Sequence, residues 1–167
     1  CPQPFHSSLR ASLLWREHAR RTGKPQSLER AESEARAASR HASNEEQKIR
    51  AGIELATASL LAFDLTGGPE RLTSAEGIIA SLPTARRTQL NEALEITQAR
   101  IAARRAALTG SVEALSAACE TMERAVQQLK GPQRLTEMAL RIEQTILSLD
   151  LGLMTRDLRR LDQAGQD

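Results

Sequence analysis

Chemistry at a protein site needs acids, bases, nucleophiles or metal ligands close together, and this sequence offers few such groups. His6, His18 and His41 are too far apart to form the i, i+4 ligand pair that a helix presents. Cys119 lies in an apolar helical pattern and is interpreted as a small buried residue, so with Cys1 it makes neither a disulfide framework nor a metal site. Phosphate-binding, dinucleotide-binding and zinc-protease motifs are also missing from the sequence. We therefore predict a protein that is not an enzyme, with no catalytic residue, metal or cofactor.

Charged side chains on the predicted helices are better candidates for a function in binding. Arginine accounts for 20 of the 23 basic residues, and its guanidinium group can pair with a carboxylate through two hydrogen bonds. The net charge is only +2, the arginines form no single stripe and aromatic residues make up 2% of the chain, so nucleic acid is not the expected partner. We expect a protein or peptide partner with acidic and apolar positions. The candidate residues for binding it are Arg16, Arg20, Glu54, Arg100 and Arg104.

A second candidate surface is apolar and lies near the end of the sequence. Its leucines and methionine follow steps of four, three, four and three, which is the spacing of a heptad seam. Such a seam either folds back as a cap on the preceding helix or serves as a docking or dimer surface. The seam consists of Leu147, Leu151, Met154, Leu158 and Leu161, of which Leu151, Met154 and Leu158 are the candidates for binding a partner or a second copy.

The first residue suggests a membrane anchor. A chain that starts on cysteine resembles a mature bacterial lipoprotein, in which acyl chains on that cysteine hold the N-terminus at a bilayer. Pro2 and Pro4 suit an extended tether, which would place Phe5 close to the bilayer or to a membrane partner. The alternative is that the chain has been cut arbitrarily at Cys1. The first interpretation predicts a periplasmic, membrane-anchored protein, and the second a cytoplasmic one.

The composition favours an all-α fold that positions these groups. Ala, Leu, Glu, Arg and Gln are abundant, whereas the aromatic and β-branched residues that strands prefer are scarce. Hydrophobic periodicity, together with Gly, Pro and the candidate N-cap Asn44, predicts where the helices begin and end. The expected helices cover about residues 8–22, 25–42, 44–65, 69–82, 84–108 and 111–130, followed by one from residue 132 and a last element over about 153–163.

An internal repeat connects these helices. The segment TGKPQSLERAE begins at Thr22, and TGGPERLTSAE begins 44 residues later at Thr66 and matches it at six positions. A third, weaker copy, TGSVEALSAAC, begins 43 residues further on at Thr109. Glycine suits the left-handed end of one helix, proline suits the first turn of the next, and a small alanine lets the partner helix approach closely. The residues expected to hold this structure are Gly23, Pro25, Ala31, Gly67, Pro69, Ala75, Gly110 and Ala118.

The repeat resembles the tetratricopeptide family, in a variant with long helices. The resemblance covers about residues 8–130 and is poor in the first helix of each pair, where the Trp, Leu-Gly and Tyr positions of the family are not matched. The period is also longer than the ~34 residues usual in the family. The resemblance implies a curved stack of hairpins whose concave face, formed by the first helices, binds peptides or protein segments. It rests on Gly23, Gly67 and Gly110, on Ala31, Ala75 and Ala118, and on Ala38, Leu82 and Ala125.

These observations predict stacked antiparallel helix hairpins, an α-solenoid with a C-terminal capping helix; a generic hairpin array or helical bundle is the alternative. The expected function is a non-catalytic scaffold or adaptor that binds another protein and is tethered to a membrane through Cys1. The alternative is a soluble helical bundle without an anchor that binds a ligand or nucleic acid. The expected layout is a tether over residues 1–7 and one domain over 8–167, with repeats at about 8–43, 44–83 and 84–130 and the cap at 131–167.

Overall fold

The computed structural model describes residues 4–83, 88–128, 145, 151–153 and 155–156. Within these ranges the secondary structure is helical, which confirms the all-α prediction. Most boundaries lie within a few residues of the predicted ones, because Gly, Pro and Asn44 mark them in the sequence. The helices are α1 (Pro4–Thr22), α2 (Pro25–His41), α3 (Glu45–Thr66), α4 (Pro69–Ala80), α5 (Thr88–Thr109) and α6 (Val112–Gln128).

The chain divides into two compact units, Cys1–Gln98 and Ala99–Asp167, and each is described by itself. The first unit contains α1 to α4 and the beginning of α5, and the second contains the rest of α5 and α6. A single domain over residues 8–167 stays a prediction. The expected cap over residues 131–167 lies almost entirely outside the described residues.

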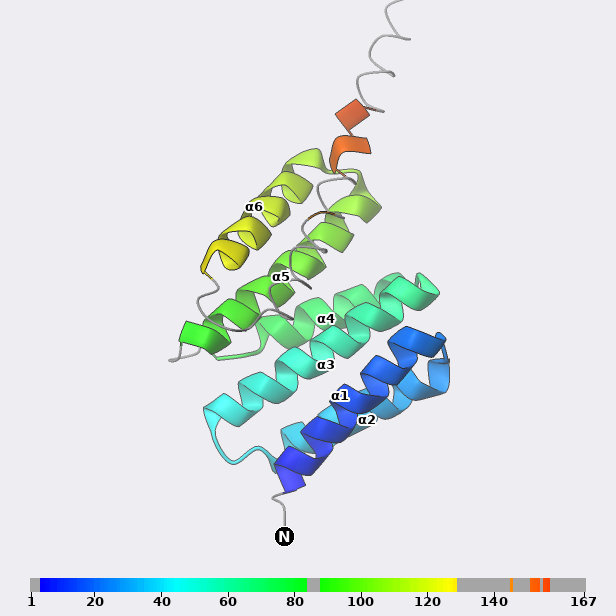
Figure 1. Cartoon of the computed structure of the whole chain (residues 1–167), viewed down its shortest axis with the longest axis vertical. Helices are drawn as coiled ribbons and strands as arrows, with labels where there is room; N and C mark the ends of the chain where they lie inside the picture. Colours follow the sequence, from blue (N-terminus) through cyan, green and yellow to red (C-terminus); the bar gives the residue numbers. More distant parts are fainter. Residues whose placement is uncertain (1–3, 84–87, 129–144, 146–150, 154, 157–167) are drawn as a thin grey trace, which may run out of the picture. The chain divides into compact units, whose positions relative to one another are not determined.

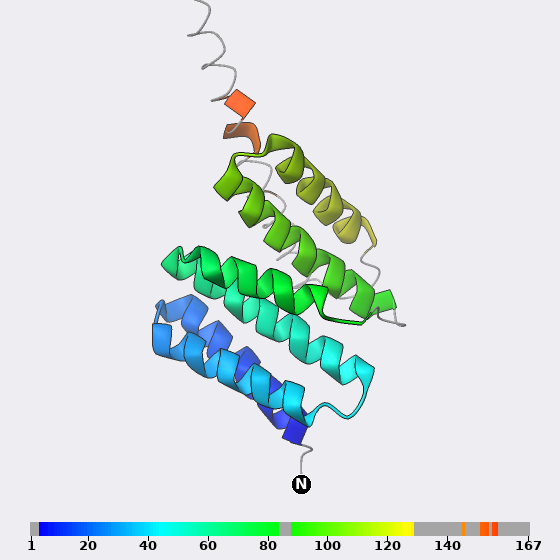
Figure 2. The same cartoon turned by 180° about the vertical axis from the view of Figure 1, so that it is seen from behind.

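The first unit is built from two helix hairpins. Helix α1 packs against α2, α3 packs against α4, and the two hairpins meet through contacts of α3 with both α2 and α1. In Figure 1, α1 and α3 lie side by side on one face of this unit. Figure 2 shows α2 and α4 on the opposite face. The first helix of each hairpin is therefore on one side of the unit and the second helix on the other.

The turns between paired helices are the same three times. Gly23, Gly67 and Gly110 have φ angles of 65°, 72° and 68°, the left-handed conformation that ends a helix and that glycine adopts without strain. In each copy the threonine before the glycine donates its hydroxyl to the carbonyl oxygen four residues earlier, at 2.7, 2.7 and 3.0 Å. The Thr-Gly pair of the repeat is thus a helix end, and the glycine part of that prediction is confirmed.

The start of the second helix uses two different solutions. Pro25 and Pro69 occupy the first turns of α2 and α4, where a missing N–H costs nothing. The third copy has no proline there, and the hydroxyl oxygen of Ser111 instead accepts a hydrogen bond of 3.2 Å from the backbone N–H of Ala114. Within the next two turns, the predicted small residues Ala31, Ala75 and Ala118 are all buried, as are Leu28, Leu72 and Leu115.

The beginning of the chain differs from the prediction. Helix α1 starts at Pro4 rather than near residue 8, because proline is well suited to the first position of a helix. Phe5 is buried and packs with Ala38 of α2 and Ala51 of α3. Burial of a phenylalanine side chain stabilises a fold by about 1.5–3 kcal/mol, which favours extending the helix to include it. Residues 4–7 are therefore helical rather than an extended tether, and the closeness of Phe5 to a bilayer or to a membrane partner stays a prediction.

Candidate interaction surface

A buried carboxylate joins α1 to α3. Glu54 is only 5% exposed, and its two oxygens accept hydrogen bonds from Nε and Nη2 of Arg16 at 2.8 and 3.0 Å. A carboxylate loses its hydration in such a place and needs this kind of paired, two-bond contact. Glu54 was predicted to be an exposed residue for partner binding, and that exposure is wrong. Arg16, predicted to be exposed with it, is half-buried and holds this carboxylate.

Ser12 extends the same contact to a third helix. Its hydroxyl is fully buried, 2.8 Å from the carbonyl oxygen of Ala31 in α2 and 3.1 Å from Oε1 of Glu54. A hydroxyl has one proton to donate, so these two acceptors share it. Sequence reasoning missed Ser12, because a serine among leucines and alanines on a helix gives no periodic signal. Its small size on the buried side of α1 was the available clue.

A second buried carboxylate joins the second helices of the two hairpins. Glu32 of α2 accepts a hydrogen bond of 2.8 Å from Nη1 of Arg71 in α4, and one of 3.1 Å from Nη2 of Arg36. Both glutamates are therefore paired across the contact between hairpins. We refer to Ser12, Arg16, Glu54, Glu32 and Arg71 as the inter-hairpin clamp, since these residues fix the spacing of α1 to α3 and of α2 to α4.

The single tryptophan belongs to the contact between α1 and α2. The guanidinium carbon of Arg30 lies 4.6 Å from the Trp15 ring centroid, a cation–π distance, and the His18 ring meets Trp15 edge-on at 5.8 Å. His18 Nδ1 is also in hydrogen-bond contact with the hydroxyl of Ser27, at 2.8 Å. These contacts give His18 a role in the packing of α1 against α2.

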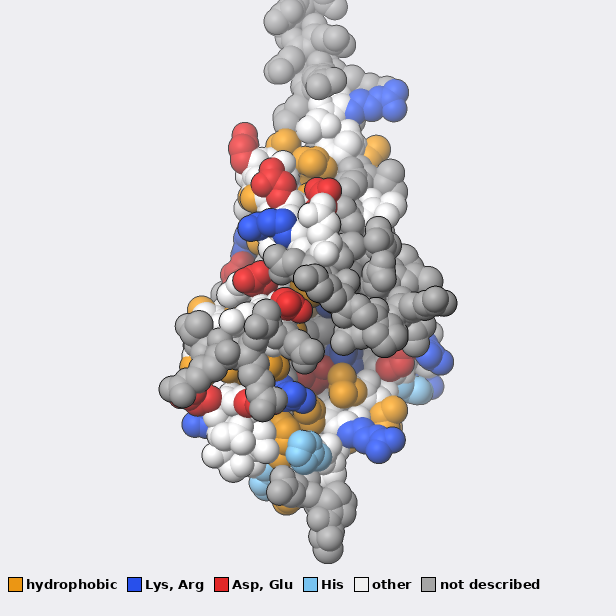
Figure 3. Space-filling view, turned by 60° about the vertical axis from the view of Figure 1, so that its left-hand side comes forward, with side chains coloured by type: hydrophobic (Ala, Val, Ile, Leu, Met, Phe, Trp, Pro, Cys, Tyr) orange, Lys and Arg blue, Asp and Glu red, His pale blue; other side chains and the backbone are white. Residues whose placement is uncertain are grey.

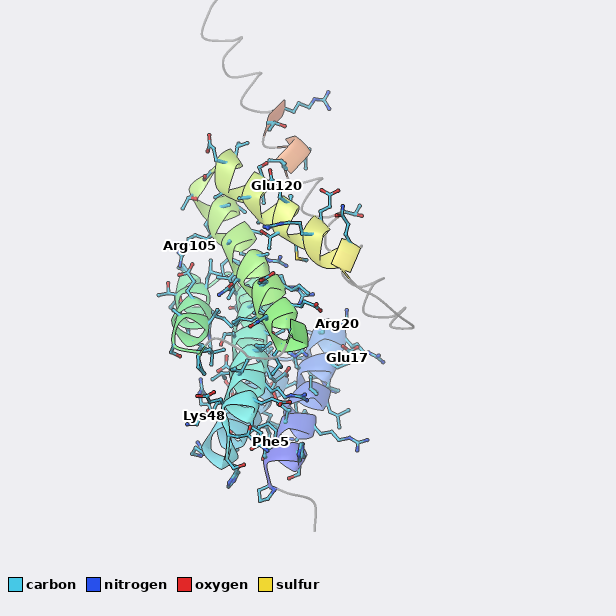
Figure 4. The ribbon with its side chains drawn as sticks, turned by 90° about the vertical axis from the view of Figure 1, so that its left-hand side faces the viewer. Phe5, Glu17, Arg20, Lys48, Arg105 and Glu120 are labelled. Atoms are coloured by element: carbon cyan, nitrogen blue, oxygen red, sulfur yellow. The ribbon has the colours of Figure 1, made fainter. Side chains whose placement is uncertain are left out.

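The side chains of α1 and α3 that point away from the second helices form a mixed polar and apolar surface. Its residues are equivalent positions of the two copies of the repeat, 44 residues apart. Figure 4 shows Glu17 and Arg20 on the outer side of α1, away from Phe5. We call this surface the first-helix face. It consists of His6, Leu13, Glu17 and Arg20 on α1 and of Arg50, Thr57, Leu61 and Asp64 on α3, all of them exposed or half-buried.

Arg20 is the one predicted α1 arginine that remains on the surface. Its guanidinium donates to the carboxylate of Glu17 at 2.9 and 3.0 Å, and Arg21 donates to the same carboxylate at 2.6 Å. These hydrogen bonds, first from Arg20 and then from Arg21, lower the pKa of Glu17 to about 2. Both arginines are in the last turn of α1, where the helix dipole favours positive charge.

The remaining predicted residues have different outcomes. Arg100 and Arg104 are half-buried rather than exposed, and each already interacts with another group of the protein. In the register of the repeat, 43 residues after α3, they occupy the positions of Thr57 and Leu61 on the first-helix face. Leu151 is half-buried. Cys1, Met154 and Leu158 lie outside the described residues.

The surface shows no separation of charge in the view of Figure 3, where positive, negative and hydrophobic side chains are interspersed. No group of three or more His, Cys, Asp or Glu residues that could hold a metal ion is found among the described residues. In the same part of the chain, no helix has the length and apolar character needed to cross a membrane. Cys119 is half-buried.

Comparison with known proteins gives no assignment. The chain has no significant match to a protein-family model, to a curated protein or to a solved structure.

Proposed function

We propose that this protein is a non-catalytic scaffold of stacked, tetratricopeptide-like helix hairpins that holds a segment of another protein on its first-helix face. The observation that carries the proposal is the pairing of α1 with α3 on one side of the first unit, held by the Arg16–Glu54 contact. The Arg16–Glu54 ion pair fixes the separation of α1 and α3, and the outer side chains of these two helices remain accessible. A fixed, accessible pair of helices is what a binding surface requires.

The chemistry of the face suggests its partner. Leu13 is 42% exposed and can take an apolar side chain, while Arg20 and Arg50 can pair with carboxylates. Both arginines are at present bonded to a glutamate of their own helix, through exposed contacts that contribute little to stability. A partner carboxylate could therefore replace these glutamates at small cost. We propose a partner segment with acidic and apolar positions.

Charge reversal on the face tests this function. Arg20→Glu combined with Arg50→Glu should weaken capture of the partner from a native extract at least tenfold, because two paired contacts become repulsive. Lys48→Glu is the matched control, since Lys48 is exposed on the same helix as Arg50 and two positions before it, which is ~200° around the helix. Both proteins are immobilised intact, and captured proteins are compared by quantitative mass spectrometry.

The outcome shows whether the first-helix face is used and whether the partner is a protein or a nucleic acid. Equal capture by the double variant and by Lys48→Glu would contradict the use of this face. Capture of nucleic acid, with a steep fall as salt is raised, would replace the scaffold function by nucleic-acid binding. Circular dichroism of each variant shows that the helices remain intact.

A further inference from the structure

Helix α3 buries a second side that α1 leaves open. Ala51, Glu54, Ala58 and Ala62 follow steps of three and four and are all buried. Ala51 packs against Phe5 and Ala38, and Ala62 packs against Ala19 and Leu28, so this side of α3 faces the preceding hairpin. Glu54 is the residue that Arg16 holds there.

The repeat identifies the equivalent side of α1. Both helices run without interruption into a Thr-Gly end at Gly23 and Gly67, so positions 44 residues apart correspond. Other corresponding positions agree in burial, since Phe5 and Ile49 are both buried, and so are Ser12 and Ala56. The counterparts of the four buried α3 residues behave differently. Ser7, Arg10, Leu14 and His18 are all exposed, although the His18 ring also contacts Trp15 and Ser27.

This open side of α1 has its own chemistry. Leu14 is 66% exposed and lies where Ala58 is covered in α3. Arg10 lies where α3 has Glu54, so the sign of the charge is reversed. No ion pair or hydrogen bond involves the Arg10 side chain within the part of the chain that the structure describes. This side therefore lies where the repeat packs one helix on another. It carries an uncovered leucine, Leu14, and an unpaired cation, Arg10.

We infer that the Ser7–Arg10–Leu14 side of α1 binds an acidic amphipathic helix of a partner protein, independently of the first-helix face. The same side of the repeat already packs on helices in α3, which argues for a helical partner. Arg10 stands where α3 has Glu54, so a carboxylate is expected opposite Arg10, in the place that Arg16 takes opposite Glu54. Apolar side chains of that helix cover Leu14. Because Arg and Leu are larger than the alanines of α3, the partner helix lies further away than α1 and α2 lie from α3.

A pair of synthetic peptides tests the inference on the full chain. One is an amphipathic helix with leucine and glutamate on the same side, and the other carries lysine in place of each glutamate. Fluorescence anisotropy of the labelled peptides should show that the glutamate peptide binds at least about tenfold more tightly. Leu14→Ser should weaken that binding about tenfold, and Arg10→Glu should transfer the preference to the lysine peptide. Leu108→Ser, which changes another exposed leucine, is the matched control and should have no effect.

The possible results are distinct. Equal binding of the two peptides, or unchanged binding in Leu14→Ser, overturns the inference. Sedimentation equilibrium that shows a dimer lost in Leu14→Ser also overturns it, because the occupant is then a second copy of the chain. The Arg20→Glu/Arg50→Glu variant should bind the glutamate peptide normally, so failure of the proposed function and failure of this inference are distinguishable. Unfolding curves should be unchanged in Leu14→Ser, because the Leu14 side chain is mostly exposed.

Discussion

Arg16 of α1 holds both carboxylate oxygens of Glu54 in α3, at 2.8 and 3.0 Å, although the two residues are 38 positions apart in the sequence. Replacing Arg16 alone by Met leaves the carboxylate buried without its cation, and we expect a loss of about 2–3 kcal/mol of unfolding free energy. Replacing both residues by Met should bring stability back to within about 1 kcal/mol of wild type, because no charge is then buried. Urea unfolding followed by circular dichroism measures both.

The control for this pair is Arg50→Met, which removes an exposed contact with Glu46 within α3. Its cost should stay below about 0.5 kcal/mol. If the single Arg16 variant were as mild as this control, the clamp would not stabilise the contact between the hairpins.

Two glycines with free space around them should respond in opposite directions to alanine. Gly67 has a φ of 72°, so Gly67→Ala forces an alanine into the left-handed region and should cost about 1–2 kcal/mol. Gly77 lies inside α4, where alanine is the better helix former, so Gly77→Ala should add about 0.5–1 kcal/mol. Thermal unfolding of the two variants gives the sign of each change in stability. If both variants were stabilised or both destabilised, the turn geometry would be contradicted.

Gly52 and Leu82 are expected to be coupled. A Cβ atom on Gly52 would collide with the Leu82 side chain. We expect Gly52→Ala to lose about 1 kcal/mol, because the crowding exceeds the gain in helix propensity. In a Leu82→Ala background the same change should instead add about 0.5–1 kcal/mol. A double-mutant cycle by urea unfolding measures the coupling, and additive effects would show that the two residues do not share this space.

Glu17 should titrate well below an ordinary glutamate. Its pKa is lowered from 4.5 to about 2 by Arg20 and Arg21, so its contribution to stability is complete above about pH 4.5 and is lost as the pH falls towards 2. The carboxylate is more than a third exposed, and screening by water limits that contribution to about 0.5 kcal/mol. Carboxyl titration by NMR measures the pKa directly. Arg20→Gln combined with Arg21→Gln should return it towards 4.5, and a wild-type pKa above 4 would disprove the paired geometry.

Local features of the fold could be predicted from the sequence. The Thr-Gly ends at residues 22–23 and 66–67, the prolines at 25 and 69 and the buried Ala31 and Ala75 all follow from conformational preferences of single residues or of one helical turn. The third copy was also recognised, although Ser111 replaces the proline by a side-chain cap. Such features need no knowledge of which helices meet.

Which polar residues become buried was decided only by the tertiary structure. Glu54, Glu32 and Ser12 lie where one hairpin meets the next, and the amphipathic pattern of α3 cannot separate the side that faces α4 from the side that faces α1 and α2. The sequence therefore indicated Glu54 as a surface residue and Phe5 as part of a tether, and both are packed instead. Burial depends on pairs of helices that are far apart in the chain, whereas helix ends depend on neighbouring residues. For this reason the sequence could determine the helix ends but not which polar residues are buried.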